Sequence, residues 1–362
     1  MNAKNLHVLR VYDRLPPLPG GMERHIAELT AAQRRLGVQV TNAFNIGRPD
    51  GDALQVLKSH QLYRLRPAIL RNLVFYGAIL AHRKALSRSR VDVVHAHGGW
   101  SAFMFARALA RAIGAPVVAA SVHDFIKRNP ALHRRAMKGC DPVFATGLAE
   151  ARYLRDVLGH PVHHLPSAPA DIFFAPPTAQ VEPADVIVVG SLVAKKRVEL
   201  VLECAARRPD LRFAIYGDGP ERARLEALRS QGGLANIAFH GEVPIDGIQA
   251  AMQGARLFLN VAQFEGSPTA ALEAMACGLP VVLTPSNDYS DLIQAGKNGI
   301  VTSGWDVEEI TAAIDQCLAN EGQRRAMGEM ARQAASGHRW DAKARFVTDA
   351  MVNMLENRTG RG

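Results

Sequence analysis

The sequence is poor in cysteine, in aromatic residues and in long apolar runs. Four of its 362 residues are cysteine, and 6% are aromatic. The cysteines have no metal-site or redox spacing, so we expect reduced core residues in a cytoplasmic protein. The N-terminal apolar run is too short for a signal peptide, and no apolar stretch approaches the length of a membrane span. The composition therefore predicts a soluble globular protein.

Acidic residues are scarce in the first half of the chain. Residues 1–168 contain 24 Lys and Arg against 10 Asp and Glu, a balance of +14, whereas residues 169–362 have a balance of −5. A basic half is typical of a domain that faces an anionic partner, although a solubilising surface has the same composition. The basic residues are not interleaved with aromatic ones and lie on no recognisable reading helix. Nucleic-acid binding is therefore the weakest interpretation of this charge.

Short apolar runs alternate with amphipathic helical patterns along the whole chain. Runs of this kind at residues 6–12, 91–96, 116–122, 185–190, 211–217 and 255–260 predict strands of parallel sheets that helices cover on both faces. The Pro- and Ala-rich stretch near residue 170 lacks periodicity and interrupts the alternation. We therefore predict an α/β protein of two doubly wound, Rossmann-like domains that face each other across a cleft. The predicted parts are residues 1–168, a linker at 169–183, a second domain at 184–335, and a C-terminal helix at 336–362 that packs back on the first domain.

The most informative segment is FEGSPTAALEAMACGLPVV, in which Glu265 and Glu273 are eight residues apart. Ser267 suits an N-cap and Pro268 the first helical position, so Glu265 precedes a helix and Glu273 lies about two turns inside it. Gly278 then ends the helix. A helix N-terminus attracts phosphate, and flanking carboxylates suit hydroxyl groups, so the segment predicts a nucleotide-sugar site.

Other loops end strands and carry polar or glycine residues. By themselves these patterns are weak, because turns and solvated loops also have them. Their shared position is more informative, because the carboxyl ends of parallel strands gather at one edge of a sheet. The candidates are Gly20 and Gly21; His97 and His123; Ser191, Lys195 and Lys196; and Gly217, Asp218 and Gly219.

Two further patterns have competing interpretations. Asp50 and Asp52 form a D-x-D pair, but it lies in the basic half, away from the phosphate features, and we do not expect a metal there. Residues 62–90 combine an apolar stretch with flanking arginines. That segment suits peripheral contact with an anionic membrane, and equally a core-facing helix with a solvated basic side.

Taken together, GG-x-E near the N-terminus, GSLVAKK, GDGP, FHGEV and E-x7-E resemble the retaining nucleotide-sugar glycosyltransferases of family 4, which have the GT-B fold. The resemblance covers nearly the whole chain and is most specific in its second half. It implies transfer of a hexosyl group from a UDP-, GDP- or ADP-sugar to an acceptor held by the basic first domain. A lipid-linked or anionic glycan of the cell envelope or of an exopolysaccharide suits that charge, at the inner face of the membrane.

The resemblance also implies a role for each matching residue. Glu265 engages the hydroxyls of the donor sugar, Glu273 holds the ribose, Lys196 binds the diphosphate, and His123 lies near the reacting sugar. Gly20 and Gly21 close over the phosphates. The other donor contacts are Ser191, Lys195, Gly217, Asp218, Gly219, Phe264, Gly266, Ser267, Thr269 and Ala270.

One residue departs from the family pattern. Ser191 stands where family members commonly have an arginine. One positively charged side chain fewer therefore binds the diphosphate, unless Lys195 takes the place of that arginine. The resemblance implies no metal and no cofactor. A sugar-nucleotide 2-epimerase of the same fold is the alternative activity, and isomerisation of the donor without an acceptor would identify it.

Overall fold

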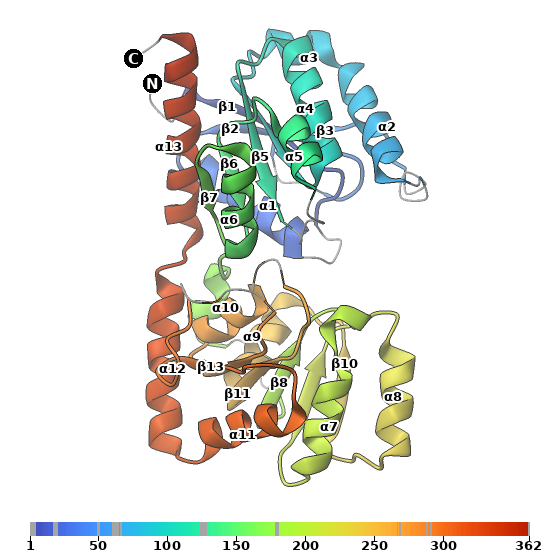
Figure 1. Ribbon diagram of the computed structural model, residues 1–362, viewed down its shortest axis with the longest axis vertical. Coiled ribbons are helices and arrows are strands. Elements are labelled where there is room, and N and C mark those ends of the chain that lie inside the picture. Colours follow the sequence, from blue (N-terminus) through green and yellow to red (C-terminus); the bar gives the residue numbers. More distant parts are fainter. Residues whose placement is uncertain are drawn as a thin grey trace. The chain divides into compact units, whose positions relative to one another are not determined.

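The chain folds into two compact units in a computed structural model that describes residues 5–16, 21–48, 51–59, 65, 67–123, 129–177, 181–265, 267, 269–286, 289 and 292–360. Unit 1 comprises residues 1–167 and 340–362, and unit 2 comprises residues 168–339. Each unit contains a parallel sheet with helices around it (Figure 1). The chain therefore passes between the units twice, after Ser167 and before Trp340.

Unit 1 is built on a seven-stranded sheet in the order β3-β2-β1-β4-β5-β6-β7. All neighbouring strands are parallel. The strand order reverses between β1 and β4, which places a topological switch point at their carboxyl ends. The strands are β1 (His7–Val11), β2 (Gln39–Phe44), β3 (Ala53–Gln55), β4 (Val93–His97), β5 (Val117–Val122), β6 (Val143–Ala145) and β7 (Val162–His164).

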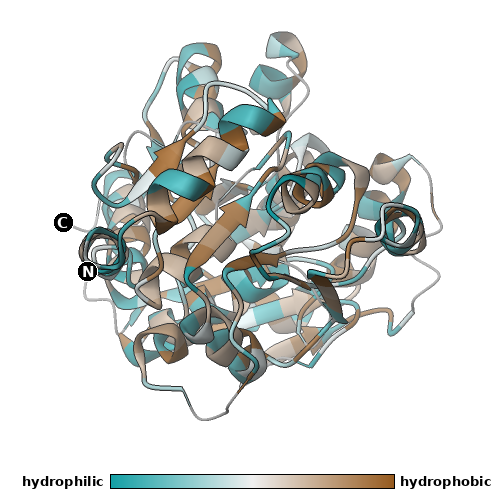
Figure 2. Ribbon diagram, turned by 90° about the horizontal axis from the view of Figure 1, so that it is seen from below, coloured by the Kyte–Doolittle hydropathy of each residue, from teal (hydrophilic) through white to brown (hydrophobic). Residues whose placement is uncertain are grey.

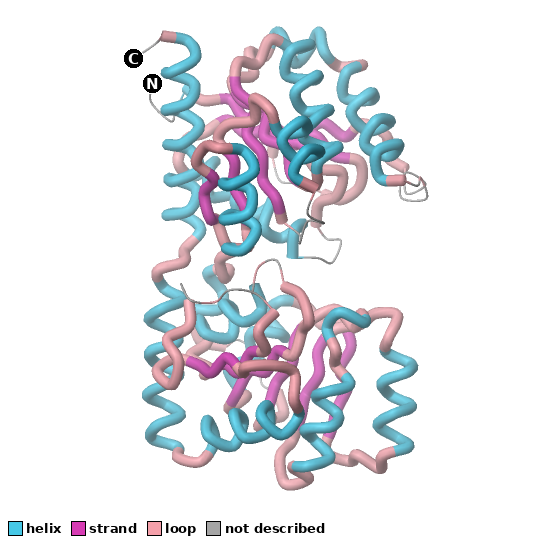
Figure 3. Tube along the Cα trace, viewed as in Figure 1, coloured by secondary structure: helices cyan, strands magenta, loops and turns pink. Residues whose placement is uncertain are grey.

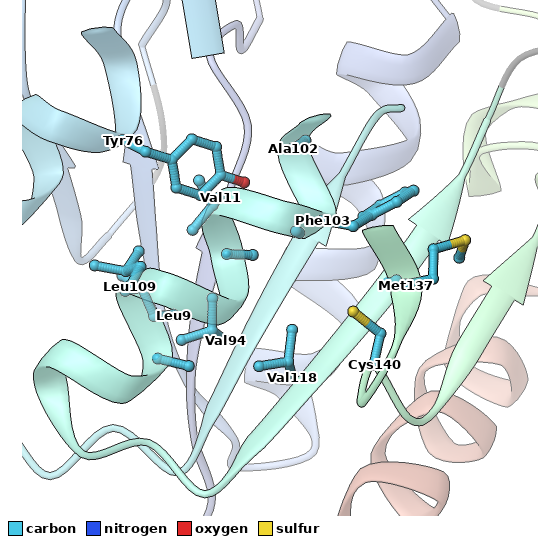
Figure 4. Packing of buried hydrophobic residues seen from close by; sticks show 14 of the residues in the cluster. Leu9, Val11, Tyr76, Val94, Ala102, Phe103, Leu109, Val118, Met137 and Cys140 are labelled. Carbon is cyan, nitrogen blue, oxygen red and sulfur yellow. The ribbon is translucent and has the colours of Figure 1, made fainter. Parts of the chain in front are cut away.

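The two faces of this sheet differ in chemistry, because successive side chains of a strand point to opposite faces. On one face, Leu9, Val94 and Val118 join an apolar cluster with Phe103 and Leu109 of helix α4 (Figure 4). The opposite face places Arg10 beside His95 in register. Helix α13 packs against α1 and β5. The helices are α1 (Gly21–Arg35), α2 (Ala68–Leu80), α3 (Arg83–Arg88), α4 (Trp100–Ile113), α5 (Pro130–Met137), α6 (Leu148–Leu158) and α13 (Trp340–Thr359).

Unit 2 is built on a six-stranded parallel sheet in the order β10-β9-β8-β11-β12-β13. This order is that of a dinucleotide-binding Rossmann fold, with the switch point between β8 and β11. Strands β8, β9, β11 and β12 are buried apart from the half-buried Val189, whereas the edge strand β10 has two exposed residues. Figure 2 shows central strands in brown, the colour of hydrophobic residues. The strands of this sheet are β8 (Val186–Val189), β9 (Phe213–Tyr216), β10 (Ile237–Gly241), β11 (Leu257–Asn260), β12 (Val281–Leu283) and β13 (Gly299–Val301).

Helices alternate with the strands from β8 to β12 along the chain (Figure 3). The helices are α7 (Glu199–Arg207), α8 (Arg222–Gln231), α9 (Ile245–Gly254), α10 (Thr269–Ala276), α11 (Val307–Leu318) and α12 (Glu321–Ser336), with short 3-10 turns η3 (Asp171–Phe174) and η4 (Ala194–Lys196). Part of the predicted linker packs onto this unit: Phe173 is fully buried, and Gln249 Nε2 donates to the carbonyl of Ile172 at 2.8 Å. An apolar side chain at residue 173 therefore anchors this segment in the core.

The prediction of two doubly wound parallel sheets is confirmed. Continuous apolar runs predicted it correctly because strands buried on both faces need apolar side chains on both. Across the described helices, none combines the length and the apolar character that crossing a bilayer requires.

Candidate functional site

Helix α10 follows the loop that carries Glu265. It begins at Thr269, so Glu273 lies about one turn inside it and not two as the sequence predicted. Gly278, with φ +82°, ends the helix as expected, because the amides of Gly278 and Leu279 donate to the carbonyls of Met275 and Ala274. This pair of bonds is a Schellman motif, which needs a left-handed residue and so favours glycine.

Lys196, Asn260 and Glu265 meet at the carboxyl end of the unit 2 sheet. Lys196 Nζ and Glu265 Oε1 form an ion pair, and Asn260 Nδ2 donates to the same oxygen at 3.0 Å. Asn260 ends β11, and Lys196 lies in the turn that follows β8, so both flank the switch point. A carboxylate fixed by a cation and an amide beside a helix start is an arrangement that can orient hydroxyl groups next to a phosphate.

The backbone holds these side chains in place. The amide of Gln263 donates to the carbonyl of Lys195 at 2.8 Å, which ties the Lys196 turn to the Glu265 loop. The amide of Glu265 donates to the carbonyl of Ser286 at 3.3 Å, and the Ser286 hydroxyl lies 2.5 Å from that of Tyr289. Burial raises the pKa of Tyr289 well above its usual range, so this hydroxyl stays protonated.

The glycine loops of unit 2 lie against one another. A Cβ on Gly217 would overlap the carbonyl group of Gly190, and one on Gly219 would overlap that of Leu192, each lying 2.8 Å from the carbonyl carbon. The amide of Leu192 donates to the carbonyl of Asp218 at 2.8 Å. Glycine at these two positions therefore allows the loops that follow β8 and β9 to pack closely against each other.

Asp218 caps its own loop. Its carboxylate accepts from the amide of Gly219 at 2.7 Å and from Arg222 at 3.0 Å, and these two bonds hold its pKa below the usual range. Tyr216, the residue that ends β9, stacks on His240 with ring centroids 4.4 Å apart. His240 lies within β10 and belongs to the motif FHGEV, but no role was predicted for it from the sequence.

The remaining predicted donor contacts are spread over this edge. Ser191, Lys195 and Phe264 are exposed, whereas Glu273 is only 2% exposed. Ser267 and the first residues of α10, Thr269 and Ala270, are half-buried. Gly266 and Pro268 lie outside the described residues. The roles assigned to these residues stay predictions.

In unit 1 the two strand-end histidines are in direct contact. His97 ends β4 and His123 follows β5, and His97 Nδ1 lies 2.8 Å from His123 Nε2. Both rings are buried. Burial, with a smaller contribution from the charge of Arg10, lowers the pKa of His123 to about 3. Burial also lowers the pKa of His97 well below its ordinary value, with smaller contributions from neighbouring histidines and from Arg10, so both rings are neutral at physiological pH.

Two residues that the sequence analysis missed surround this pair. His25 of α1 packs edge to face against His123, with ring centroids 4.6 Å apart, and against Trp340 of α13 at 4.9 Å. His95, two residues before His97, bonds Ser121 Oγ through Nε2 at 2.8 Å. The H-x-H spacing in β4 could have indicated two histidines on one face of the sheet. Nothing local to His25 or Trp340 could have brought them together.

The other features of unit 1 that the sequence singled out lie only partly within the described residues. Gly21 is the first residue of α1, and Gly20 lies outside the described part. Asp50 is likewise outside it, and the carbonyl of Asp52 accepts from Arg34 at 2.9 Å. Within the described ranges, no three His, Cys, Asp or Glu side chains are grouped so that they could hold a metal ion.

Two family descriptions match nearly the whole chain. Residues 19–168 match "Glycosyltransferase Family 4", and residues 170–334 match "Glycosyl transferases group 1". The boundary between them falls where the chain passes from unit 1 to unit 2. The Lys196–Glu265 pair therefore lies in the group 1 part and the His97–His123 pair in the family 4 part.

Relatives and solved structures agree with these matches. The chain is 28% identical to one subunit of the phosphatidylinositol N-acetylglucosaminyltransferase of Arabidopsis thaliana, over 87% of this chain and 74% of that protein. It is 27% identical to a GDP-mannose-dependent alpha-(1-6)-phosphatidylinositol monomannoside mannosyltransferase of Mycolicibacterium smegmatis, over 76% and 73%. In fold it is similar to sucrose-phosphate synthase of Thermosynechococcus elongatus, with a TM-score of 0.83, 16% identity, and coverage of 98% and 100%. These matches do not support the epimerase alternative. The chain belongs to the glycosyltransferases that join a family 4 domain to a group 1 domain, with the GT-B fold.

Proposed function

We propose that this glycosyltransferase moves a hexosyl group from a nucleoside-diphosphate sugar to a lipid-linked or anionic glycan, with retention of configuration. The observation that carries the donor part is the group of Lys196, Asn260 and Glu265 at the switch point of the unit 2 sheet. Ligands of open α/β sheets bind at such points. The relative named as GDP-mannose-dependent supports a nucleotide-sugar donor.

The charges in this group suggest how the reaction proceeds. Lys196 and the N-terminus of α10 stabilise the charge of the leaving diphosphate, so no metal ion is required. Glu265 Oε1 already takes part in the ion pair and accepts from Asn260. Such an oxygen suits the positioning of sugar hydroxyls better than nucleophilic attack. The leaving phosphate then takes the acceptor proton on the face from which it departs, which retains the configuration.

Removing the charge of Lys196 tests the donor site. We expect Lys196→Ala to lower kcat/KM for the donor on the order of 10²-fold, since a donor aimed at developing charge is lost. Glu273→Ala should weaken donor binding. Lys297→Ala is the matched control, because Lys297 is exposed and precedes β13, at the amino edge of the same sheet. Unchanged turnover and donor affinity in both site variants would refute the assignment.

A panel of nucleotide sugars identifies the donor and tests the metal proposal. The true donor and its nucleotide should raise the melting temperature most, because a ligand that binds only the folded state stabilises it. Turnover should persist in EDTA. Activity that EDTA abolishes and Mg²⁺ restores would contradict metal-free catalysis.

The acceptor part of the proposal rests on charge and on the relatives. Residues 53–91 contain eight Lys and Arg and no acidic residue. The two relatives named above carry phosphatidylinositol in their names. A basic first domain attracts an acceptor that bears phosphate or sits among anionic lipids. We place the enzyme at the inner face of the membrane, where thiols such as its four free cysteines stay reduced.

Helix α2 supplies an apolar contact for that membrane. Its Phe75, Tyr76 and Ile79 are buried, but Leu70, Leu73 and Val74 on another face are 45%, 52% and 44% exposed. Exposed cations follow in and beside α3: Arg83, Lys84, Arg88 and Arg90. Apolar side chains next to cations suit the interface of an anionic bilayer.

Vesicle sedimentation tests this contact. The full chain should bind phosphatidylcholine vesicles that contain phosphatidylglycerol more strongly than pure phosphatidylcholine vesicles. The double variant Leu73→Gln/Val74→Gln should weaken binding severalfold, and Arg83→Ala about fivefold. Leu228→Gln, at an exposed leucine of α8, is the control. Equal binding by all variants, or no preference for the anionic lipid, would exclude α2 as the contact.

A further inference from the structure

The short contact between His97 and His123 restricts where the proton of His123 can lie. The two facing atoms, His97 Nδ1 and His123 Nε2, are 2.8 Å apart, so one of them donates and the other accepts. Each ring is neutral and carries one proton on one of its two nitrogens. Two arrangements satisfy the bond, and they give opposite tautomers to both histidines.

The surroundings of His97 distinguish the two arrangements. Its other nitrogen, Nε2, is buried and has no hydrogen-bond partner among the described residues. If His123 donated, the proton of His97 would lie on this Nε2, as a buried N–H without an acceptor. If His97 donates, Nε2 carries only a lone pair. Buried N–H groups without partners are rarer in proteins than unsatisfied acceptors, which favours His97 as the donor.

We infer that His97 is a positioning residue that donates from Nδ1 to His123 Nε2 and thereby keeps the proton of His123 on Nδ1. Register supports this assignment. In the parallel β4–β5 pair, His97 lies opposite Ser121, and His123 is two residues further along, so both rings belong to the same face of the sheet. The contact therefore joins the last residue of β4 to the residue that directly follows β5.

A second contact fixes the plane of the His123 ring. His25 packs against it at an interplanar angle of 84°, and Trp340 packs against His25 at 85°. His123 thus has a hydrogen bond from one neighbour and a ring contact from another. Since Trp340 is the first residue of the chain's return to unit 1, the His25 contact also ties this ring to the start of α13.

This inference rests on the proposed function for its consequence. A neutral His123 with the proton on Nδ1 is a hydrogen-bond donor with a fixed direction, suited to an oxygen of the reacting sugar. It is not a general acid, because a neutral imidazole is a poor proton donor at neutral pH. Loss of the His97 bond should therefore reduce kcat more than it changes the KM of the donor.

The test compares two replacements of His97 in the full chain. His97→Phe keeps a planar ring and removes the donor, whereas His97→Asn keeps an N–H donor near the position of Nδ1. In protein labelled with ¹⁵N-histidine, the His123 signals are assigned by their disappearance in His123→Gln. The ¹⁵N shifts then report which nitrogen carries the proton.

We expect the proton on Nδ1 of His123 in the wild type and in His97→Asn, and a mixture of tautomers in His97→Phe. We also expect His97→Phe to lower kcat about tenfold with little change in KM, and His97→Asn to restore most of it. A proton on Nε2 in the wild type would overturn the inference even if His97→Phe fails to fold. An unchanged tautomer in His97→Phe would overturn it too. Full activity of His123→Gln would instead refute the proposed role of His123, and the wild-type spectrum would still decide the tautomer.

Discussion

At the scale of single residues, Gly217 shows how closely the donor-site loops approach one another. Its φ is +126°, which few other residues adopt, and the Gly190 carbonyl carbon lies 2.8 Å from where a Cβ would be. A substitution here therefore meets both a conformational and a steric penalty.

We expect Gly217→Ala to destabilise unit 2 by about 3 kcal/mol or more. Gly233→Ala is the control, because Gly233 also has a positive φ, +61°, but no atom lies within 4 Å of its Cβ position. That variant should lower the free energy of unfolding by about 1–2 kcal/mol, which is the conformational penalty without the steric one. Urea unfolding measures both, monitored by Trp305 fluorescence in a background that carries Trp100→Phe and Trp340→Phe. Equal costs would show that the contact with Gly190 relaxes freely.

At the scale of elements, helix α13 is connected to the unit 1 sheet through a chain of buried polar groups. Arg10 of β1 bonds Gln33 Oε1 of α1, and Gln33 Nε2 donates to Thr348 Oγ1 of α13 at 2.9 Å. Burial lowers the pKa of Arg10 to about 9, so it remains charged at neutral pH. A buried cation of this kind needs its hydrogen-bond acceptors.

Replacing Thr348 by Val should break this connection. The change keeps the shape of the side chain but leaves an amide donor of Gln33 without its partner, which costs about 1–3 kcal/mol. Thr359→Val is the control, since Thr359 is exposed and bonds within its own helix. Thermal unfolding compares the two variants, and an equal effect would mean that Gln33 finds another acceptor.

At the scale of the molecule, the histidines make unit 1 the acid-sensitive half. Eleven of the 13 histidines lie in unit 1. The pKa values of His25, His95 and His97 are well below the ordinary value, chiefly because of burial, and that of His123 is about 3. Within the part of the chain that the structure describes, the cations facing this cluster are Arg10 of β1 and Lys343 of α13, and both oppose protonation.

The sign of the resulting pH dependence follows from proton uptake. The unfolded chain binds protons at these histidines below pH 6.5 and the folded chain does not, so stability is lost as the pH falls from 6.5 toward 3. Each of these four buried histidines should lower the free energy of unfolding by roughly 2 kcal/mol as the pH falls from 7 to 5. In a Trp305→Phe variant, the remaining tryptophans, Trp100 and Trp340, report unit 1 alone.

We therefore expect unit 1 to unfold at a higher pH than unit 2. His25→Phe should lower the number of protons taken up on acid unfolding by about one. Both His25 ring nitrogens are buried without a hydrogen-bond partner among the described residues, so this histidine gains its proton only when the unit unfolds. His240→Phe, at an exposed histidine of unit 2, should not change it. Simultaneous unfolding of both units in acid, with no effect of His25→Phe, would contradict the prediction.

The sequence by itself determined the two parallel sheets, the helix between Glu265 and Gly278, and the edge at which the candidate residues gather. Apolar runs and capping residues act on neighbouring residues of the chain, so the sequence alone predicts the elements that they form. Only the tertiary structure decided that Lys196 pairs with Glu265, 69 residues away, and that His25 and Trp340 enclose His123. Those contacts depend on the order of the strands in each sheet and on where α13 packs. Neither can be predicted from a local sequence pattern.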